Sequence, residues 1–310
     1  MTTDHDSAWA TIAVTGATGK QGGATARRLL AGGRRVRALV RDESTPAASA
    51  LRAAGAELAV ADFDEPSSLG PALAGVTALF AVPPVAYGPA GSDPESEFAR
   101  GRALVDAATF AEVRQVVFTG VASTSGAAFA APGKRRIEQY LHERIPLVTV
   151  LRPVRFMTNY LGVTGVGLDG LVDGVHRHLF TPDAPLQIIA LEDIAEFAAL
   201  AFEQPDRFAG RTLELAGDAP TPVEAAAAIS AATGIAVRYE QVTHDEAAAL
   251  NPEFAEVRQQ WDAGHRWHAD IEALRVIHPG LRTFADWLAE SGAAALRARL
   301  LGEQPAPRTV

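Results

Sequence analysis

The sequence predicts an α/β protein with a doubly wound parallel sheet, followed by a second, smaller C-terminal α/β lobe. Two observations favour this fold class. Short, continuous apolar runs alternate with helical patterns through the first half of the chain, which is typical of a parallel sheet covered by helices on both faces. In addition, a glycine-rich turn lies between the first apolar run and the first helical pattern, where the first crossover of such a sheet begins.

Six runs are predicted to be strands because they are short, apolar and rich in β-branched residues. They cover residues 12–15, 36–40, 57–61, 76–82, 115–119 and 147–151. Between them, apolar residues recur at helical spacing, and glycine or proline residues mark the helix ends. These predicted helices cover residues 20–31, 45–54, 66–73, 95–110 and 132–144. Right-handed crossovers between the strands then give a Rossmann-like sheet.

The pattern changes after Arg152 and Pro153. The next stretch, residues 157–173, is glycine-rich and irregular. Further on, Thr221 and Glu224 have the spacing of a capping box, which predicts the start of a helix. The other elements predicted in this half are a helix over residues 192–203 and a strand over residues 212–215.

The length of 310 residues suits one large domain or two modest ones. We expect residues 1–153 to form the first domain, with the segment from about 187 to 217 packed back onto it. Residues 154–186 and 218–310 are expected to form the smaller lobe.

The composition excludes several classes of function. With 28 basic and 37 acidic residues the net charge is −9, which disfavours direct nucleic-acid binding through phosphate contacts. The absence of cysteine removes disulfides and thiolate metal sites, and it fits a reducing compartment. No apolar run approaches the roughly 20 residues that cross a bilayer, and the short acidic start does not resemble a secretion signal. We therefore expect a cytoplasmic protein that binds neither nucleic acid nor membrane.

Ligands of open parallel sheets bind at the carboxyl ends of the strands, so the residues directly after each predicted strand are the candidates for a site. Gly16, Gly19 and Gly22 come after the first strand. This spacing brings backbone N–H groups and a helix N-terminus to a pyrophosphate. The alternative is a glycine-rich turn without a ligand. Because the turn lies between a strand and a helix, it predicts a bound dinucleotide.

Residues after the next two strands indicate which dinucleotide. Arg41 follows the second predicted strand, where an acidic residue would bind the ribose of NAD. A guanidinium there suits a 2′-phosphate instead, and the alternative is a solvated surface arginine. Asp62 and Phe63 follow the third strand and suit adenine by hydrogen bond and apolar contact, or Asp62 is a loop or cap residue. The predicted cofactor is NADP(H).

Lys134 lies in the first turn of a predicted helix, where a cation opposes the helix dipole. This unfavourable placement favours a functional role over a solvated lysine. Ser123 follows the fifth strand and is either a substrate contact or a turn residue. No metal site is predicted, because the two histidine pairs lack cysteine partners or an HExxH motif. These pairs are His176 with His178 and His265 with His268.

A series of motifs then resembles a known family. In chain order they are VTGATGKQGG, VRALVRD, ADFDEPSSL, VVFTGVAS, Lys134 before IEQYL, LRPVRFMTNYL, IIALEDIAEFAALAF and HPGLRTFADWL. Together they resemble the NmrA-like family of atypical short-chain dehydrogenase/reductases, over most of the chain. The resemblance implies a Rossmann domain with a small C-terminal lobe, NADP(H) binding, and a place for Lys134 near the nicotinamide ribose.

The expected site combines both lines of reasoning. The expected catalytic residues are Lys134 and Ser123. Short-chain dehydrogenases place a tyrosine four residues before the lysine as proton donor, but here that position is Ala130. The residues expected to bind the cofactor are Gly16, Thr18, Gly19, Lys20, Gln21, Gly22, Arg41, Asp62, Phe63, Val82, Pro83, Lys134 and Pro153.

Two functions are compatible with this site. The first is an NADPH-dependent reductase that passes hydride to a small apolar conjugated or carbonyl acceptor, such as a quinone, enone or imine. Phe156, Tyr160, Trp261 and Trp267 suit an apolar substrate pocket, or are core residues. The alternative is a non-catalytic NADP(H)-binding redox sensor that acts through a protein partner. A homodimer is compatible with either function.

Overall fold

A parallel sheet is the centre of the structure, a computed structural model that describes residues 11–83, 87–88, 91–124, 131–162 and 168–303. Its strands are β1 (Thr11–Val14), β2 (Arg35–Val40), β3 (Glu57–Val60), β4 (Ala78–Ala81), β7 (Gln115–Thr119), β8 (Leu147–Pro153) and β13 (Thr212–Leu215). They lie in the order β13-β8-β7-β4-β1-β2-β3. The pairings from β8 across to β3 are parallel.

The sheet forms because its central strands are apolar on both faces. Every residue of β4 is buried, and so are the last three residues of β1. Val14 pairs with Ala38 on one side and with Phe80 on the other. Strands buried on both faces need helices on both sides, and the chain supplies them.

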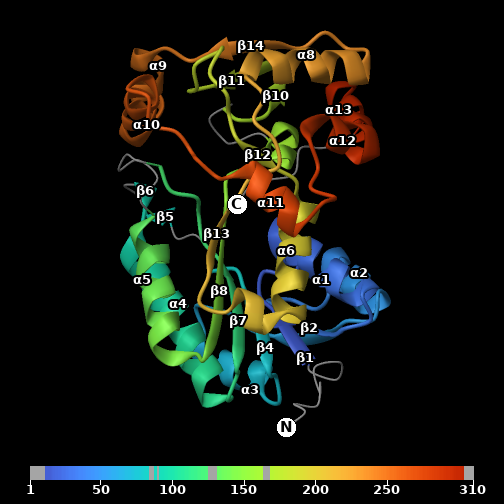
Figure 1. Cartoon of the computed structure of the whole chain (residues 1–310), viewed down its shortest axis with the longest axis vertical. Helices are drawn as coiled ribbons and strands as arrows, with labels where there is room; N and C mark the ends of the chain where they lie inside the picture. The colour runs from blue at the N-terminus through green and yellow to red at the C-terminus, as the bar shows by residue number, and fades with distance from the viewer. Residues whose placement is uncertain (1–10, 84–86, 89–90, 125–130, 163–167, 304–310) are drawn as a thin grey trace. The chain divides into compact units, whose positions relative to one another are not determined.

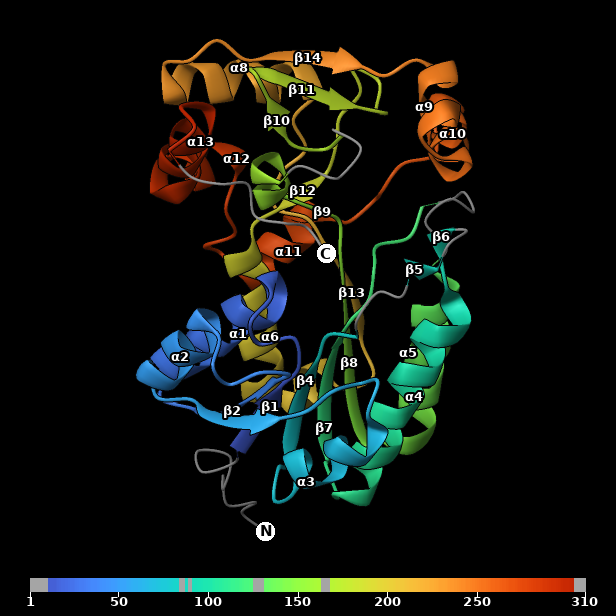
Figure 2. The ribbon, with the colours of Figure 1, turned by 180° about the vertical axis from the view of Figure 1, so that it is seen from behind.

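Helices cover the two faces of this sheet (Figure 1). α4 and α5 lie on one side, and α1, α2 and α6 lie on the other, which the view from behind also shows (Figure 2). Their bounds are α1 (Lys20–Ala31), α2 (Pro46–Ala53), α4 (Pro94–Phe110), α5 (Pro132–Arg144) and α6 (Leu191–Glu203). The shorter elements of this part are η2 (Pro66–Ser68), α3 (Leu69–Leu73), β5 (Tyr87–Gly88), β6 (Gly91–Ser92) and α7 (Pro205–Phe208).

The chain divides into two compact units. Unit 1 comprises residues 1–121, 131–152 and 194–213, and unit 2 comprises residues 122–130, 153–193 and 214–310. Unit 2 has a small sheet of β10 (Leu171–Val172), β11 (Val175–His178) and β14 (Arg238–Gln241). Its other strands are β9 (Arg155–Phe156) and β12 (Ile188–Ile189). Its helices are η4 (Met157–Leu161), α8 (Pro222–Thr233), α9 (His244–Leu250), α10 (Pro252–Asp262), α11 (Ile271–Ile277), α12 (Phe284–Trp287), η5 (Leu288–Gly292) and α13 (Ala293–Leu300).

The predicted α/β class and its parallel sheet are confirmed. The capping box is confirmed too, because Thr221 and Glu224 bond reciprocally at the start of α8. The helix predicted over residues 66–73 is instead a 3₁₀ turn followed by the short α3. Pro71 lacks the N–H that a continuous α-helix would need there. No helix in the described ranges is both long enough and apolar enough to span a bilayer.

Candidate dinucleotide site

The strand order reverses between β1 and β4. The chain runs outward from β1 to β2 and β3, then returns to place β4 on the other side of β1. Doubly wound sheets bind ligands at the carboxyl ends of the strands that flank such a switch point. These two ends carry the glycine turn after β1 and the Val82-Pro83 pair after β4. The residues predicted from the sequence thus lie at the edge where this topology places ligands.

The three glycines of the turn differ in how strongly the fold requires them. Gly16 has φ +58°, a left-handed conformation that favours glycine. A Cβ at Gly22 would lie 2.5 Å from the carbonyl oxygen of Thr15, so this residue must be glycine for α1 to pack on the turn. Gly19 has φ −92°, and the neighbour that a Cβ there would meet among the described residues is the carbonyl oxygen of Gly16, at 3.2 Å. Apart from this one tight contact, the described residues leave the space above Gly19 open.

The N-terminus of α1 begins at this open space. Gly19 is the N-cap residue and has no side chain that could cap the helix, and the first turn contains no acidic residue. Gly16, Thr18 and Gly19 are exposed, and Lys20 is half-buried. The positive end of the helix dipole is thus available to an anion.

Two threonines fix the ends of the strands around the turn. Thr15 Oγ1 donates to the carbonyl oxygen of Val82 at 3.0 Å and accepts from its N–H at 2.7 Å, which joins the end of β1 to the end of β4. Thr119, the last residue of β7, donates to Gln21 Oε1 at 2.7 Å. Sequence reasoning missed both threonines, although each stands at the end of a buried strand, directly before the turn or loop.

Arg41 follows β2 and is exposed. It makes no hydrogen bond or ion pair with the part of the chain that the structure describes. Arg37, on the same strand, is used structurally: its guanidinium donates to the carbonyl oxygens of Ala72 and Ala74 and pairs with Glu57 at 3.0 Å. Arg41 is thus available to a ligand.

Asp62 and Phe63 follow β3, and both are half-buried. Asp62 Oδ1 accepts the N–H of Asp64 at 3.0 Å, which closes a turn. Asp62 is therefore a turn residue, as the alternative interpretation predicted, and this bond uses one of its two carboxylate oxygens. Phe63 packs against the apolar core of unit 1. Nothing in these contacts tests the predicted contact with adenine, which stays a prediction.

Lys134 is buried in the first turn of α5, and its ammonium pairs with the carboxylate of Glu97 from α4. Both side chains are 9% exposed. Lys134 thus lies on the buried side of α5, as Ile137 does. Sequence reasoning did not find Glu97, because a glutamate in an amphipathic helix is typical of a solvated face.

Ser123 and Pro153 belong to unit 2. The hydroxyl and the backbone N–H of Ser123 both donate to Glu214 Oε1, the N–H at 3.2 Å. Because its hydrogen is used in this bond, the Ser123 hydroxyl offers acceptor lone pairs to a ligand. Pro153 ends β8, and its carbonyl oxygen accepts the N–H of Ala122 at 3.1 Å. Ala130 lies outside the described residues.

The histidine pair of β11 belongs to a buried polar cluster of unit 2. Arg155 Nε donates to Asp169 Oδ1 at 2.7 Å, and His178 Nε2 lies 3.2 Å from the same oxygen. His176 lies 3.5 Å from the Arg155 guanidinium. Burial and the adjacent Arg155 hold the pKa of His176 well below its ordinary value, and burial also lowers the pKa of His178. Burial alone would raise the pKa of Asp169, but Arg155 and His178 lower it.

The aromatic residues of unit 2 are core residues for the most part. Tyr160, Trp261 and Trp267 are buried, and Phe180 joins the two tryptophans in one cluster. Phe156 is half-buried. Among the residues that the structure describes, no group of three or more histidine, cysteine or acidic side chains could hold a metal ion.

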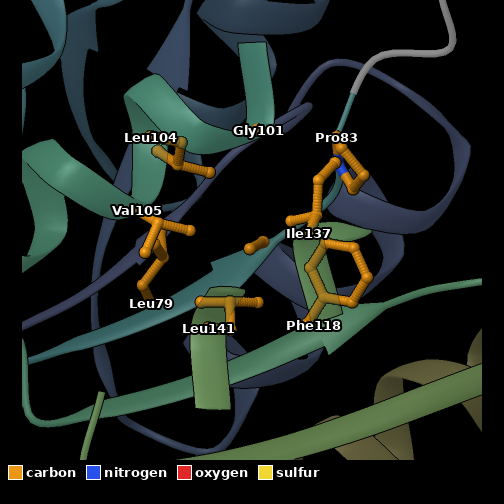
Figure 3. Close-up of a pocket in the computed structure, with 9 residues that line it drawn as sticks. Leu79, Pro83, Gly101, Leu104, Val105, Phe118, Ile137 and Leu141 are labelled. Carbon is orange, nitrogen blue, oxygen red and sulfur yellow. The ribbon is translucent and has the colours of Figure 1, made fainter. Parts of the chain in front are cut away.

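Two hollows of unit 1 are lined by residues other than those of the glycine turn. One is an apolar cavity of about 10 Å³ between α4, α5 and the sheet (Figure 3), too small for more than about one water molecule. The other is a surface hollow of about 620 Å³ at the opposite edge of the sheet, beside the residues that precede β4, β7 and β8. The small cavity is lined by Leu79, Ala81, Pro83, Gly101, Leu104, Val105, Phe118, Ile137 and Leu141.

Known proteins are similar to this chain over most of its length. The model of the NmrA-like family matches residues 9–277. The NmrA-like family domain-containing oxidoreductase cpsB of Aspergillus campestris (strain IBT 28561) is 30% identical over 280 residues, which cover 82% of each chain. The (4-alkanoyl-5-oxo-2,5-dihydrofuran-3-yl)methyl phosphate reductase of Streptomyces griseus subsp. griseus is 28% identical over 295 residues, which cover 91% of this chain and 98% of the reductase.

Solved structures show the same fold. Crystal structures of NmrA, a negative transcriptional regulator, in complex with NAD and with NADP match with TM-scores of 0.75 and 0.74. Each match covers 94% of this chain and 98% of NmrA at 20% sequence identity. At this identity the likeness is one of fold.

Proposed function

The chain belongs to the NmrA-like family, and from this premise we propose that it is an NADPH-dependent reductase. In this proposal it transfers hydride to a small apolar acceptor whose double bond is conjugated to a carbonyl or an equivalent group. The glycine turn after β1 supplies the cofactor site. The names of the Aspergillus and Streptomyces relatives, an oxidoreductase and a reductase, support an enzymatic activity.

One observation carries the cofactor proposal: the open space above Gly19. The fold itself requires glycine at positions 16 and 22, but it requires glycine at position 19 far less. A ligand that approaches the backbone closely explains the third glycine. The uncapped N-terminus of α1 lies beside this space and favours a negatively charged group such as a pyrophosphate.

Arg41 supports NADP(H) rather than NAD(H). It is an exposed guanidinium at the carboxyl end of β2, and a bidentate donor suits a phosphate. Asp62 and Phe63 would contact the adenine, and Val82, Pro83 and Pro153 would line the strand ends around the cofactor. Arg41 supplies hydrogen-bond donors for a phosphate, and the phenylalanine, valine and proline side chains supply apolar surface for the cofactor.

Once bound, NADPH supplies the hydride chemistry, and the protein's contribution is to orient the reactants and stabilise charge. Lys134, in the first turn of α5, is paired with Glu97 of α4. Its ammonium would stabilise the negative charge that develops on the acceptor. Ser123 is proposed as a substrate contact rather than as a donor, because its hydroxyl hydrogen is bound to Glu214 and only its lone pairs face a ligand.

The absence of an acidic side chain at position 130 indicates the class of acceptor. A simple ketone needs a proton donor as hydride arrives. A conjugated acceptor gives a delocalised anion that can take its proton from water. The name of the Streptomyces relative describes such an acceptor, a dihydrofuranone with carbonyl groups next to its ring double bond. Three side chains are candidates for a substitute proton donor: Tyr87, Tyr160 and His176. Tyr160 and His176 are buried, which disfavours them, and the side chain of Tyr87 is outside the part of the chain that the structure describes.

A second candidate function is a redox sensor that binds NADP(H) and acts through a protein partner. The likeness in fold to NmrA, a negative transcriptional regulator that was crystallised with NAD and with NADP, favours this candidate. The affinity of a sensor for its protein partner must differ between the NADP⁺-bound and the NADPH-bound state, because a ligand shifts an equilibrium only by its differential affinity.

Steady-state NADPH oxidation with a matched pair of acceptors, cyclohexenone and cyclohexanone, tests the proposed function. We expect the enone to be turned over faster than the saturated ketone. Faster turnover of the ketone, with a pH profile that shows one essential acid, would contradict the proposed acceptor class. Tight NADPH binding without turnover of any quinone, enone, imine or triphenylmethane dye would favour the sensor.

A further inference from the structure

Two close approaches, one helical turn apart, hold α4 against α5. In the first, Gly133 of α5 faces Glu97 of α4: a Cβ at Gly133 would lie 2.5 Å from Glu97 Oε2. In the second, Gly101 of α4 faces Ile137 of α5, and a Cβ at Gly101 would overlap the Ile137 side chain. Figure 3 shows Gly101 and Ile137 on the two facing helices. The backbone of α5 therefore lies directly against the carboxylate of Glu97.

The charges at this contact are arranged around Lys134. The first turn of α5 contains no acidic residue, and its N-cap, Ala131, offers no side-chain cap. Lys134 thus adds a positive charge to the positive end of a helix, which is unfavourable. Glu97 compensates both charges at once, because its carboxylate pairs with the ammonium of Lys134 and lies beside Gly133 in the same turn.

Burial makes this pair different from the other ion pair between the same helices. Arg136 of α5 and Glu95 of α4 also pair, but their side chains are 41% and 79% exposed. Lys134 and Glu97 are each 9% exposed. An exposed pair contributes little, whereas a buried ammonium without its counter-ion is strongly unfavourable. Without Glu97, Lys134 would be driven to leave its buried position.

We propose that Glu97 is a positioning residue for cofactor binding: it holds Lys134 where the ammonium can donate to the nicotinamide ribose of NADP(H). An ammonium has three N–H donors, so a bond to Glu97 leaves two donors for ribose hydroxyls. This inference rests on the proposed function, because it requires that NADP(H) binds. It assigns a role to a residue of α4, far in sequence from the glycine turn and from Lys134.

A purely structural ion pair would stabilise α4 against α5 without changing cofactor binding selectively. Two ligands separate these roles. NADPH carries both the 2′-phosphate adenosine and the nicotinamide ribose, whereas adenosine 2′,5′-bisphosphate carries only the adenosine half. If Glu97 acts through Lys134 on the nicotinamide ribose, its loss weakens NADPH binding and leaves the bisphosphate unaffected.

The experiment is a calorimetric titration of wild-type protein and three variants with both ligands. The variants are Glu97→Gln, Glu97→Asp and, as the matched control on the same helix contact, Glu95→Gln. We expect Glu97→Gln to raise the Kd of NADPH about tenfold or more, the range of one charge-assisted hydrogen bond, with less than about a twofold change for the bisphosphate. Glu97→Asp, which keeps the charge, should recover part of the loss, and Glu95→Gln should match the wild type.

A double variant tests whether Glu97 acts on NADPH binding through Lys134. In a Lys134→Met background, Glu97→Gln should cause no further loss of NADPH affinity, because Glu97 acts only through Lys134. Equal weakening of both ligands, an unchanged NADPH Kd in Glu97→Gln, or a further loss in the Lys134→Met background would each overturn the inference. If the wild type binds the bisphosphate but not NADPH, this inference fails; if it binds neither ligand, the proposed function fails.

Discussion

Each glycine in the turn after β1 has its own physical reason. Gly16 adopts a left-handed conformation, Gly22 allows α1 to approach the turn, and Gly19 leaves space for a ligand. These reasons predict different outcomes for substitutions of the same kind. Substitutions at these positions therefore distinguish the glycines that the fold requires from the one that cofactor binding requires.

Gly19→Val should abolish most NADPH binding and leave the fold intact. The valine side chain would extend into the open space above the turn and block the approach of the pyrophosphate. We expect an affinity loss of at least about tenfold with a Tm close to that of the wild type, measured by calorimetric titration and thermal unfolding. Gly22→Val is the matched comparison, and it should lower the Tm because of its backbone clash. Normal NADPH binding by folded Gly19→Val would show that the turn is not the cofactor site.

Arg41→Ala should remove the preference for NADPH over NADH. A charge-assisted hydrogen bond to the 2′-phosphate contributes about 1.5–3 kcal/mol, so the ratio of the two Kd values should fall about tenfold or more. Arg35 is the control, because it is exposed at the amino end of the same strand, β2. Titration of both variants with both cofactors gives the ratios. Equal cofactor affinities in the wild type, or an unchanged ratio in Arg41→Ala, would exclude the assigned role.

At the scale of elements, one buried carboxylate joins two distant motifs of unit 2. Asp193, in the first turn of α6, is completely buried. It accepts from Arg282 Nη1 at 2.6 Å and from the Arg282 backbone N–H at 3.1 Å, and it lies 3.3 Å from His278 Nε2. The start of α6 is thus fixed to the segment between α11 and α12.

Asp193→Asn should destabilise the protein by about 1–3 kcal/mol, because it removes the buried charge that accepts from the Arg282 guanidinium and backbone N–H, while Arg282 keeps its bond to Glu290. Glu272→Gln is the control, since Glu272 pairs with Arg275 within the neighbouring helix α11 but is exposed. The control should change the stability by less than about 1 kcal/mol. Urea unfolding measures both values. A similar effect of the two substitutions would show that the buried pair contributes no more than a surface pair.

At the scale of the whole molecule, the buried cluster around His176 makes stability depend on pH. The pKa of His176 is lowered well below its ordinary value of 6.5, first by burial and then by Arg155. The unfolded chain therefore takes up a proton near pH 6.5 that the folded chain does not bind. Stability from this group is fully present above that pH and is lost as the pH falls below it.

We expect the free energy of unfolding to fall on acidification below about pH 6.5, with a contribution from His176 of up to about 1.4 kcal/mol per pH unit. His176→Gln should reduce this slope, because glutamine does not titrate. The measurement is urea unfolding at several pH values, monitored by the fluorescence of Trp261, Trp267 and Trp287, which lie in unit 2. An identical slope in the variant and the wild type would contradict the assignment to His176.

The sequence predicted unit 1 better than unit 2 for a physical reason. Strands such as β4 are buried on both faces and appear as continuous apolar runs, and the glycine turn is local in sequence. Contacts between residues far apart in sequence leave no such signal. The pairing of Glu97 with Lys134 and that of Asp193 with Arg282 join segments that are separated along the chain, so only the fold reveals them.

The candidate site shows the same difference between local patterns and long-range contacts. The sequence located the glycine turn, Arg41 and Lys134 because each stands next to a predicted strand end or helix start. It did not locate Thr15, Thr119 or Glu97, whose roles depend on which strand or helix lies beside them. Unit 2 has short strands and helices with polar and apolar residues mixed, and its small sheet was not predicted.

The transfer of deuterium from NADPH to an acceptor tests the proposed hydride transfer most directly. The protein would be incubated with a conjugated enone and with NADPH that carries deuterium at both C4 positions of the dihydronicotinamide, and the product would be analysed by mass spectrometry. We expect a reduced product that carries one deuterium on carbon, formed by the wild type and not by Gly19→Val. A product without deuterium, or equal labelling by Gly19→Val, would contradict hydride transfer from a cofactor bound at the glycine turn.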